Sequence, residues 1–226
     1  MNGREVKREI SIPQQMIWGL LLVVVVSVLG IGVWSLRRNL ARQGTSDSTP
    51  LEGLKIFGSV PDFLLTERDG RQVTLPDLKG KVLVTNFIYT NCPDTCPIQS
   101  AQMRELQAEF IAEKDVRLVS ITVDPERDTP KILSEYAHRF GADSNRWLFL
   151  TGEKRAIYRL AQEGFYLAAV EIPQEKRPST GATHTHSPRF VLIDRVARIR
   201  GYYTATDAET MVRLRRDLKT LLRTGE

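Results

Sequence analysis

The sequence is poor in residues that bind soft metals or carry redox chemistry. Its 226 residues include two cysteines, Cys92 and Cys96, and three histidines. Three residues separate the cysteines, and a disulfide that closes so short a loop removes little chain entropy. A domain of this size does not need such a bond for its stability. The pair is therefore expected to serve chemistry, either redox or metal binding, rather than to act as a structural disulfide.

Concentrated positive charge is also missing. Lysine and arginine number 32 against 27 for aspartate and glutamate, and the excess is scattered, with part of it in VRLRRDLKTLLR near the C-terminus. No stretch combines a basic patch with interleaved aromatic residues, and no known nucleic-acid-binding module is present. We interpret the basic residues as a solvated helix face and do not expect a nucleic-acid partner.

Charged residues are absent between Glu9 and Arg37, and the segment 16–34 reads MIWGLLLVVVVSVLGIGVW. Nineteen helical residues span about 28 Å, close to the thickness of the hydrocarbon core of a bilayer. Trp18 and Trp34 lie near its two ends, where indole rings favour the membrane interface. No small-residue cleavage site follows the run, so we expect an uncleaved single-pass anchor.

The chain divides around this anchor. We expect an N-terminal tail over residues 1–15, the transmembrane anchor over 16–36, a polar linker over 37–50 and one soluble domain over 51–226. Three basic residues lie on each side of the apolar run, so the positive-inside rule does not decide which side of the membrane the domain faces.

Within the soluble domain, buried strands alternate with amphipathic helices. Nearly continuous apolar runs predict strands that are buried on both faces, at residues 82–89, 116–123 and 189–194. Apolar residues at helical spacing predict helices at 97–114, 130–140, 153–165 and 211–222. A hairpin with its turn at Asp69-Gly70 precedes the first buried strand. The pattern predicts an α/β fold with a central β-sheet flanked by helices.

The stretch FIYTNCPDTCP, residues 87–97, joins the first buried strand to the first long helix. Pro97 suits the first position of a helix, so Cys96 is expected at or next to the N-cap, with Cys92 in the preceding loop. The positive end of the helix dipole favours thiolates and is expected to lower the pKa of both cysteines. The polar residues and prolines around them predict an exposed loop. Two such thiolates can converge on one soft metal ion.

A histidine would complete a metal site. His138 lies inside a predicted helix and is interpreted as an exposed helix residue. His184 and His186 lie in GATHTHSP, a predicted loop that in a sheet of this kind abuts the loop carrying the cysteines. His186 is nearer the following strand and so better fixed in position. Two thiolates and an imidazole suit Cu(I) or Cu(II), but they also suit zinc, and the spacing does not separate these metals.

Three motifs, in this order, resemble the SCO/SenC family of copper chaperones: FIYTNCPDTCP, ITVDPERDTP and HSPRFVLID. The resemblance covers residues 57–222. It implies a thioredoxin-like fold and copper, as Cu(I) or Cu(II), bound by Cys92, Cys96 and His186. It further implies delivery of copper to the dinuclear CuA centre of cytochrome c oxidase subunit II, with reduction of that subunit's cysteines as a second activity. The chain would then be a metallochaperone rather than an enzyme.

A single N-terminal membrane anchor is typical of that family, and the resemblance implies that the soluble domain lies outside the cytoplasmic face. No transit-peptide signature is evident, so we expect the inner membrane of a bacterium, with the domain facing the periplasm. Other periplasmic copper carriers and thiol reductants are expected as further partners.

One histidine and two aspartates leave alternatives open. His184 creates a His-x-His that is not typical of the family, so it either competes as a ligand or is incidental. Asp124 and Asp128 in VDPERDTP could form a second metal site. We favour a turn at Asp124 and a cap by Asp128 or Thr129 for the helix that follows.

Two other functions share the cysteine motif. A thiol–disulfide oxidoreductase of the thioredoxin class would use Cys92 and Cys96 as a redox-active pair, although its motif is usually CxxC and the spacer here has three residues. A thiol peroxidase of related fold would use one activated cysteine. The oxidoreductase is kept as the alternative to the copper chaperone.

Overall fold

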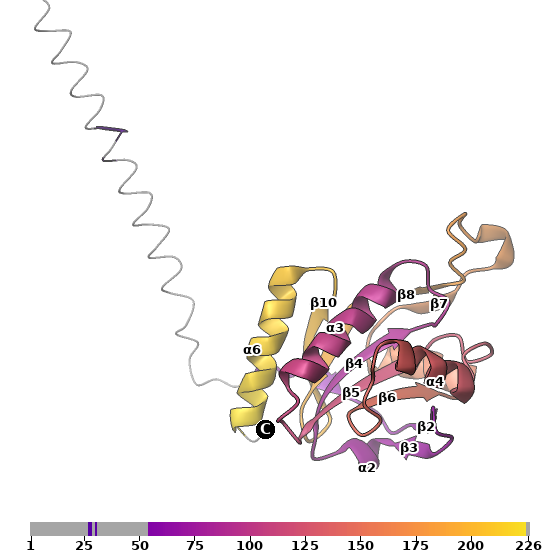
Figure 1. The fold of residues 1–226 in the computed structure, drawn as a ribbon, viewed down its shortest axis with the longest axis horizontal. Coiled ribbons are helices and arrows are strands. Elements are labelled where there is room, and N and C mark those ends of the chain that lie inside the picture. Colours follow the sequence, from indigo (N-terminus) through magenta and orange to yellow (C-terminus); the bar gives the residue numbers. More distant parts are fainter. Residues whose placement is uncertain (1–26, 29, 31–53, 225–226) are drawn as a thin grey trace, which may run out of the picture. The chain divides into compact units, whose positions relative to one another are not determined.

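The computed structural model describes residues 27–28, 30 and 54–224, and the fold is that of residues 54–224 (Figure 1). The predicted tail, almost all of the predicted anchor and the whole predicted linker lie outside the described residues. None of the helices in the described part of the chain is long and apolar enough to cross a membrane. Leu54 begins the compact unit that carries the candidate site.

An eight-stranded sheet forms the centre of this unit, in the order β1-β10-β9-β4-β5-β6-β2-β3. Its strands are β1 (Gly58–Ser59), β2 (Leu64–Glu67), β3 (Gln72–Thr74), β4 (Val82–Ile88), β5 (Val116–Thr122), β6 (Trp147–Thr151), β9 (Arg189–Ile193) and β10 (Arg198–Thr204). The central strands β4, β5 and β6 run parallel, and β9 pairs antiparallel with β4. All seven residues of β4 are buried, because helices cover both faces of the sheet.

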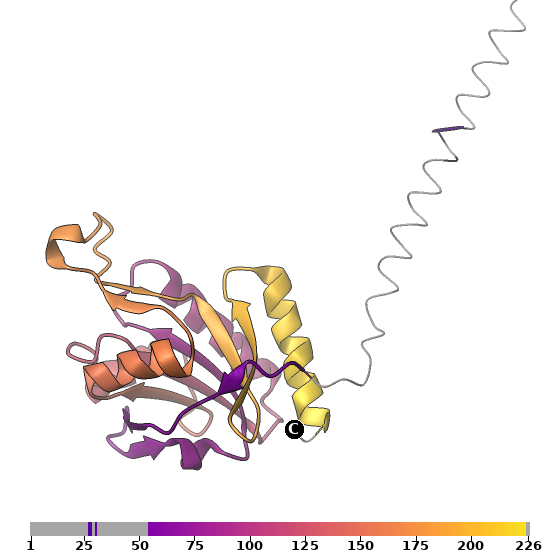
Figure 2. The ribbon, with the colours of Figure 1, turned by 180° about the vertical axis from the view of Figure 1, so that it is seen from behind.

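The helices pack on both faces of this sheet. They are α2 (Leu75–Leu78), α3 (Thr95–Glu109), α4 (Pro130–Arg139), α5 (Lys154–Arg159) with the π-helical turn Leu160–Gly164, and α6 (Ala208–Thr224), together with a 3-10 turn at Gln174–Lys176. α3, α4 and α6 cover the face seen in Figure 1, and α5 covers the face seen in Figure 2. α3 and α4 each connect adjacent parallel strands, and right-handed crossovers place both on one face. The predicted α/β fold with a central sheet flanked by helices is confirmed.

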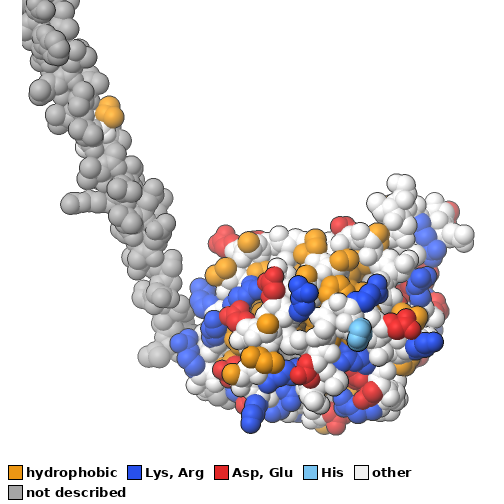
Figure 3. Space-filling model, viewed as in Figure 1, with side chains coloured by type: hydrophobic (Ala, Val, Ile, Leu, Met, Phe, Trp, Pro, Cys, Tyr) orange, Lys and Arg blue, Asp and Glu red, His pale blue; other side chains and the backbone are white. Residues whose placement is uncertain are grey.

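Side-chain contacts join the helices of the first face. Ser100 in α3 and Tyr136 in α4 share a buried hydrogen bond of 2.8 Å. Arg215 in α6 lies 3.0 Å from Glu105 and 2.9 Å from Glu109, both in α3. These pairs neutralise part of the positive charge on α6, and Figure 3 shows cationic and anionic side chains interspersed over this face.

Several predicted elements are found where the sequence places them. The strands predicted at 82–89, 116–123 and 189–194 correspond to β4, β5 and β9. The predicted hairpin is formed by β2 and β3. Gly70 in its turn has a φ of +89°, a conformation that residues with a side chain rarely adopt.

Two features differ from the expectation. β6 is missing from the predicted strands, although its sequence WLFLT is apolar and fully buried. A second, two-stranded sheet pairs β7 (Ala169–Glu171) with β8 (His184–His186), so the predicted loop GATHTHSP contains a strand. The polar sequence of β8 lacks the apolar pattern of a core strand. Among the described strands β8 pairs with β7 alone, and the segment between the two projects away from the central sheet (Figure 1).

Candidate metal centre

The cysteines lie where the central strand β4 passes into α3. β4 ends at Ile88, α3 begins at Thr95, and the loop between them carries Cys92. The backbone N–H of Cys92 donates to the carbonyl oxygen of Tyr89 over 3.2 Å, which closes a tight turn. Cys96 lies in the first turn of the helix. β4 and α3 therefore place both sulfurs beyond the carboxyl end of the central strand.

The helix begins two residues before Pro97, where the sequence predicts its start. Asp94 is the N-cap, and Cys96 occupies the second helical position. Pro97 is tolerated at the third position because N–H groups in the first turn have no intrahelical acceptor. Such a shift lies within the usual variation of helix ends, so Cys96 is still next to the N-terminus of α3.

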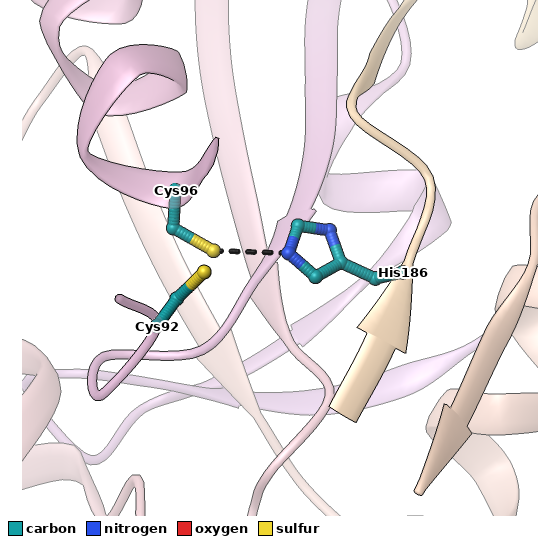
Figure 4. Close-up of side chains that lie close together, drawn as sticks. All are labelled: Cys92, Cys96 and His186. Atoms are coloured by element: carbon teal, nitrogen blue, oxygen red, sulfur yellow. Dashed lines mark hydrogen bonds between the residues drawn. The ribbon is translucent and has the colours of Figure 1, made fainter. Parts of the chain in front are cut away.

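His186 approaches the cysteines from the β7–β8 hairpin. Its Nε2 atom lies 3.0 Å from the Sγ atom of Cys96, and Figure 4 shows both sulfurs and the imidazole pointing toward one another. The other ring nitrogen, Nδ1, faces the carbonyl oxygen of Ser187 at 3.3 Å. A carbonyl can only accept, so Nδ1 carries the proton and the lone pair of Nε2 faces Sγ of Cys96. Of the described residues, Cys92, Cys96 and His186 form the one group of this kind, with ligand atoms within 4.8 Å of one another.

The two sulfurs have different environments. Cys96 is fully buried, whereas Cys92 is half-buried, and both are free thiols. Burial raises the pKa of Cys96, while the hydrogen bond from Cys96 lowers the pKa of Cys92 far below its ordinary value. The expectation of an exposed loop with two acidic thiols is therefore wrong for Cys96. Burial against the charged form outweighs the helix dipole at that sulfur.

Tyr89 is a buried aromatic residue beside the centre that sequence reasoning does not identify. Its ring centroid lies 5.3 Å from that of His184 and 5.7 Å from that of His186, with the latter pair at 90°. Burial raises the pKa of Tyr89, so its phenol stays neutral. Its place directly after the apolar run of β4 and three residues before Cys92 is the signal that could have revealed it. Tyr89 packs against both imidazoles and fixes the face of β8 that carries them.

His184 is buried but lies outside the ligand group. Its Nδ1 atom lies 2.9 Å from Oγ1 of Thr183 and 3.9 Å from a carboxylate oxygen of Asp124. Burial lowers the pKa of His184 and favours the neutral ring. His184 thus helps to hold the hairpin against the domain. His138, by contrast, is exposed on α4, as the sequence predicts.

The aspartates of VDPERDTP form a turn and do not join a metal-binding group among the described residues. The carbonyl oxygen of Asp124 accepts the backbone N–H of Asp128 over 2.8 Å. Thr129 is the N-cap of α4, and its Oγ1 accepts the N–H of Ile132 over 3.4 Å. The predicted turn and cap are confirmed, with Thr129 rather than Asp128 as the capping residue.

The donor set determines what the centre can bind. Two sulfurs and one imidazole nitrogen are soft ligands that fit copper. Zinc accepts the same donors, but a structural zinc site closes with four ligands, and only three converge here among the described residues. The neighbouring thiols also permit a disulfide as an alternative oxidised state.

Comparisons with known proteins identify a matching family and several relatives of the chain. The family model described as SCO1/SenC matches residues 57–223. The SCO1 protein homolog of Bacillus subtilis is 40% identical over 117 residues, which make up 51% of this chain and 60% of that protein. The chain thus spans less than two thirds of the length of this curated relative.

Two solved structures are similar over most of the domain. BsSco, described as a member of the Sco family of cytochrome c oxidase assembly proteins with a disulfide switch, is 31% identical with a TM-score of 0.64. The match covers 76% of this chain and 98% of BsSco. ScoI of Bradyrhizobium japonicum, solved with copper bound, is 29% identical with a TM-score of 0.58. That match covers 70% of this chain and 98% of ScoI.

Proposed function

The chain belongs to the SCO1/SenC family, and from this premise we propose that it binds copper and takes part in the assembly of cytochrome c oxidase. The observation that carries the proposal is the convergence of Cys92, Cys96 and His186, whose ligand atoms lie within 4.8 Å of one another. Copper, the metal implied by the family resemblance, is the metal bound in ScoI of B. japonicum, which supports the assignment. The family resemblance inferred from the three motifs is confirmed.

In this proposal the copper ion is cargo, and the three side chains have distinct roles. Cys92 is half-buried and has a lowered pKa, so it offers a thiolate that incoming copper can reach. His186 offers Nε2, since its proton is on Nδ1. Cys96 loses its proton when copper binds, because a metal ion replaces the desolvated thiol proton as the partner of the buried sulfur.

Loading depends on the redox state of the cysteines. A Cys92–Cys96 disulfide has no thiolate to offer, so only the reduced chain can take up copper. A reductant that converts the disulfide to two thiols therefore controls loading. This dependence is the reason to expect thiol reductants among the partners, beside other copper carriers.

We propose subunit II of cytochrome c oxidase, with its CuA centre, as the receiver of the copper. The similarity to BsSco, a member of a family of cytochrome c oxidase assembly proteins, supports oxidase assembly as the process. The half-buried position of Cys92 supports direct transfer, because ligands of a receiving site can reach the ion from the side of that sulfur. Transfer from the copper-loaded chain to the metal-free CuA domain, followed by the absorbance of the CuA centre, tests this step.

We also propose that residues 16–36 anchor the chain in a bacterial inner membrane with the domain in the periplasm. The uncharged segment between Glu9 and Arg37 supports the anchor. In intact spheroplasts, a membrane-impermeant maleimide should then label Cys92, and a Cys92→Ser variant provides the background. Labelling that requires lysis of the cells would refute this orientation.

Metal analysis of the purified, reduced chain is the experiment that tests copper binding. We expect one copper ion per chain and a thiolate-to-Cu(II) charge-transfer band. The band should vanish in His186→Ala and in Cys92→Ser. His138→Ala, which changes an exposed histidine of α4, is the matched control and should bind like the wild type. The proposal fails if the reduced wild type takes up no copper.

A thiol–disulfide oxidoreductase is the second candidate, and the unequal burial of the two sulfurs favours it. Cys92, the more exposed sulfur, would attack a disulfide of a substrate protein and form a mixed disulfide. Cys96 would then attack Cys92, so the substrate is released with two thiols and the pair becomes a disulfide. Reductase turnover that is unchanged in His186→Ala would favour this function over copper transfer.

A further inference from the structure

Asp128 is a buried carboxylate that accepts three hydrogen bonds at the start of the cysteine loop. Its side chain is 0% exposed. Oδ2 accepts the backbone N–H of Thr90 over 3.0 Å and the hydroxyl of Thr122 over 2.5 Å. Oδ1 accepts the hydroxyl of Thr90 over 2.6 Å. Asp128 thus binds Thr90, which is distant in the sequence, and Thr122, which lies on another element.

These hydrogen bonds join the ends of two strands to the loop that carries Cys92. Thr122 is the last residue of β5, and Ile88, its partner across the parallel ladder, is the last residue of β4. Thr90 lies two residues after the end of β4 and two residues before Cys92. Asp128 therefore fixes the point at which the chain leaves the sheet and enters the loop.

Asp128 is itself held rigidly. Its backbone N–H donates to the carbonyl oxygen of Asp124 over 2.8 Å. The next residue, Thr129, caps α4, so Asp128 is not needed as the cap. The N-terminus of α4 favours a negative charge at this place. Because its backbone and its side chain are both fixed, the Asp128 carboxylate can determine the position of the threonine groups that it binds.

We propose that Asp128 is a positioning residue of the metal centre, which sets the loop so that Sγ of Cys92 meets Sγ of Cys96 and Nε2 of His186. The proposal rests on the proposed metal site, but the arrangement of the two thiols can be tested without metal. When Asp128 is removed, the N–H and the hydroxyl of Thr90 lose their partner and the loop gains conformational freedom. Metal binding or disulfide formation must then order the loop again, which opposes both.

Three variants distinguish the positioning effect of Asp128 from the effect of its charge. Asp128→Ala removes all three hydrogen bonds. Asp128→Asn keeps the shape: its carbonyl oxygen can replace Oδ2 as acceptor, and its NH2 group can donate to the hydroxyl of Thr90, so only the charge is lost. Thr90→Val removes one hydroxyl and leaves the rest in place. Asp217→Ala is the matched control, because Asp217 is also a buried carboxylate and accepts the hydroxyl of Tyr203 over 2.8 Å.

The first measurement uses the metal-free chain. The protein dithiol is equilibrated with oxidised glutathione, which yields the Cys92–Cys96 disulfide and two molecules of reduced glutathione. We expect the equilibrium constant to fall by about tenfold or more in Asp128→Ala, because the thiols are less well oriented for each other. It should be unchanged in Asp128→Asn and in Asp217→Ala.

The second measurement is the Cu(II) affinity of the same full-length variants, by competition with a chelator. We expect about a 10- to 100-fold loss in Asp128→Ala, as for other residues that orient metal ligands. Thr90→Val should lose about two- to tenfold, in line with one hydrogen bond. Asp128→Asn should bind as the wild type does.

Several results would overturn the proposal. Wild-type values in Asp128→Ala would do so, and so would equal losses in Asp128→Asn and Asp128→Ala, which would assign the effect to charge. If Asp128→Ala does not fold, unchanged values in Thr90→Val overturn the proposal and reduced values support it. If the wild type binds no copper, the proposed function fails, and the glutathione equilibrium still decides the role of Asp128.

Discussion

The Nε2 atom of His186 lies 3.0 Å from the Sγ atom of Cys96, the more deeply buried of the two cysteines. The contact joins the first turn of α3 to the β7–β8 hairpin, across 90 residues of sequence. Because Nδ1 of the same ring faces the carbonyl oxygen of Ser187, the imidazole is oriented from both sides. The third donor of the centre is thus aimed at the sulfurs.

His184 and His186 are expected to respond differently to substitution. His186→Ala removes a proposed ligand and should lower the Cu(II) affinity by at least about tenfold. His184→Ala should keep one copper ion per chain, because His184 lies outside the ligand group, but it should lower the free energy of unfolding by about 1–3 kcal/mol. Metal analysis and urea unfolding of the two variants check this. Loss of copper in His184→Ala at unchanged stability would contradict it.

The two thiols should differ in reactivity and in their dependence on pH. The pKa of Cys92 is lowered, so its thiolate is present throughout the neutral range and its alkylation rate should change little between about pH 6 and 9. Cys96 should react slowly at every pH in that range, since it is buried and its pKa is raised. Mass spectrometry after timed iodoacetamide treatment reports both rates. A Cys92 rate that rises tenfold per pH unit, as for an ordinary thiol below its pKa, would contradict the prediction.

Lys154 in α5 is expected to hold the hairpin that carries His186. Its Nζ atom lies 2.7 Å from Glu171 in β7 and 3.0 Å from Glu126. The pairs are partly exposed, so Lys154→Ala should change the free energy of unfolding by less than about 1 kcal/mol. Hydrogen exchange should nevertheless become faster at the amides of Ile172 and Ser187, which are bonded at the ends of the hairpin.

A charge exchange provides the control for this prediction. The double variant Lys154→Glu, Glu171→Lys restores an ion pair of opposite polarity and should slow the exchange again. Exchange that is as slow in Lys154→Ala as in the wild type would show that the hairpin is held by other contacts.

Arg200 and Asp194 form a buried ion pair that should dominate the stability of the sheet edge. Nη1 of Arg200 lies 2.8 Å from Oδ2 of Asp194, and both residues are buried. Arg200→Ala removes the buried cation and leaves the carboxylate with the partly exposed Arg198 and backbone N–H groups, so it should cost about 3–5 kcal/mol of unfolding free energy. Urea unfolding at pH 7 measures this loss. A loss below about 1 kcal/mol would contradict it.

The same pair predicts how stability depends on pH. Burial opposes ionisation of Asp194, but the backbone N–H of Arg198 and the guanidinium groups of Arg200 and Arg198 outweigh it and lower the pKa of the carboxyl. A carboxyl with a lowered pKa stabilises the fold above its unfolded value and loses that contribution as the pH falls through its folded value. The wild type should therefore lose stability below about pH 4, and Arg200→Ala should lose less over the same range.

Much of the fold follows from apolar runs in the sequence. A strand that helices cover on both faces must be apolar along its length, so β4, β5 and β9 are visible as runs. The convergence of Cys92, Cys96 and His186 was expected from the order of three motifs and the family that they resemble, and the structure brings the three side chains together.

Other features depend on contacts between distant segments, which local patterns do not report. The strand β8 has no apolar alternation, because a peripheral two-stranded sheet is held by backbone pairing. The burial of Cys96 arises from packing around the first turn of α3 and reverses the pKa shift expected from the helix dipole. The hydrogen bonds of Asp128 to Thr90 span 38 residues, so the aspartate is predicted as a cap and not as a support of the cysteine loop.

The first residue of the compact unit is fixed to the central sheet by hydrogen bonds. Nε and Nη2 of Arg200 both donate to the carbonyl oxygen of Leu54, the first residue of the compact unit, and β1 then pairs with β10. A pull on the preceding segment is therefore borne by the edge of the sheet, and β9 lies between that edge and β4. In the membrane-anchored chain proposed above, these contacts would keep tension in the preceding segment from reaching the cysteine loop.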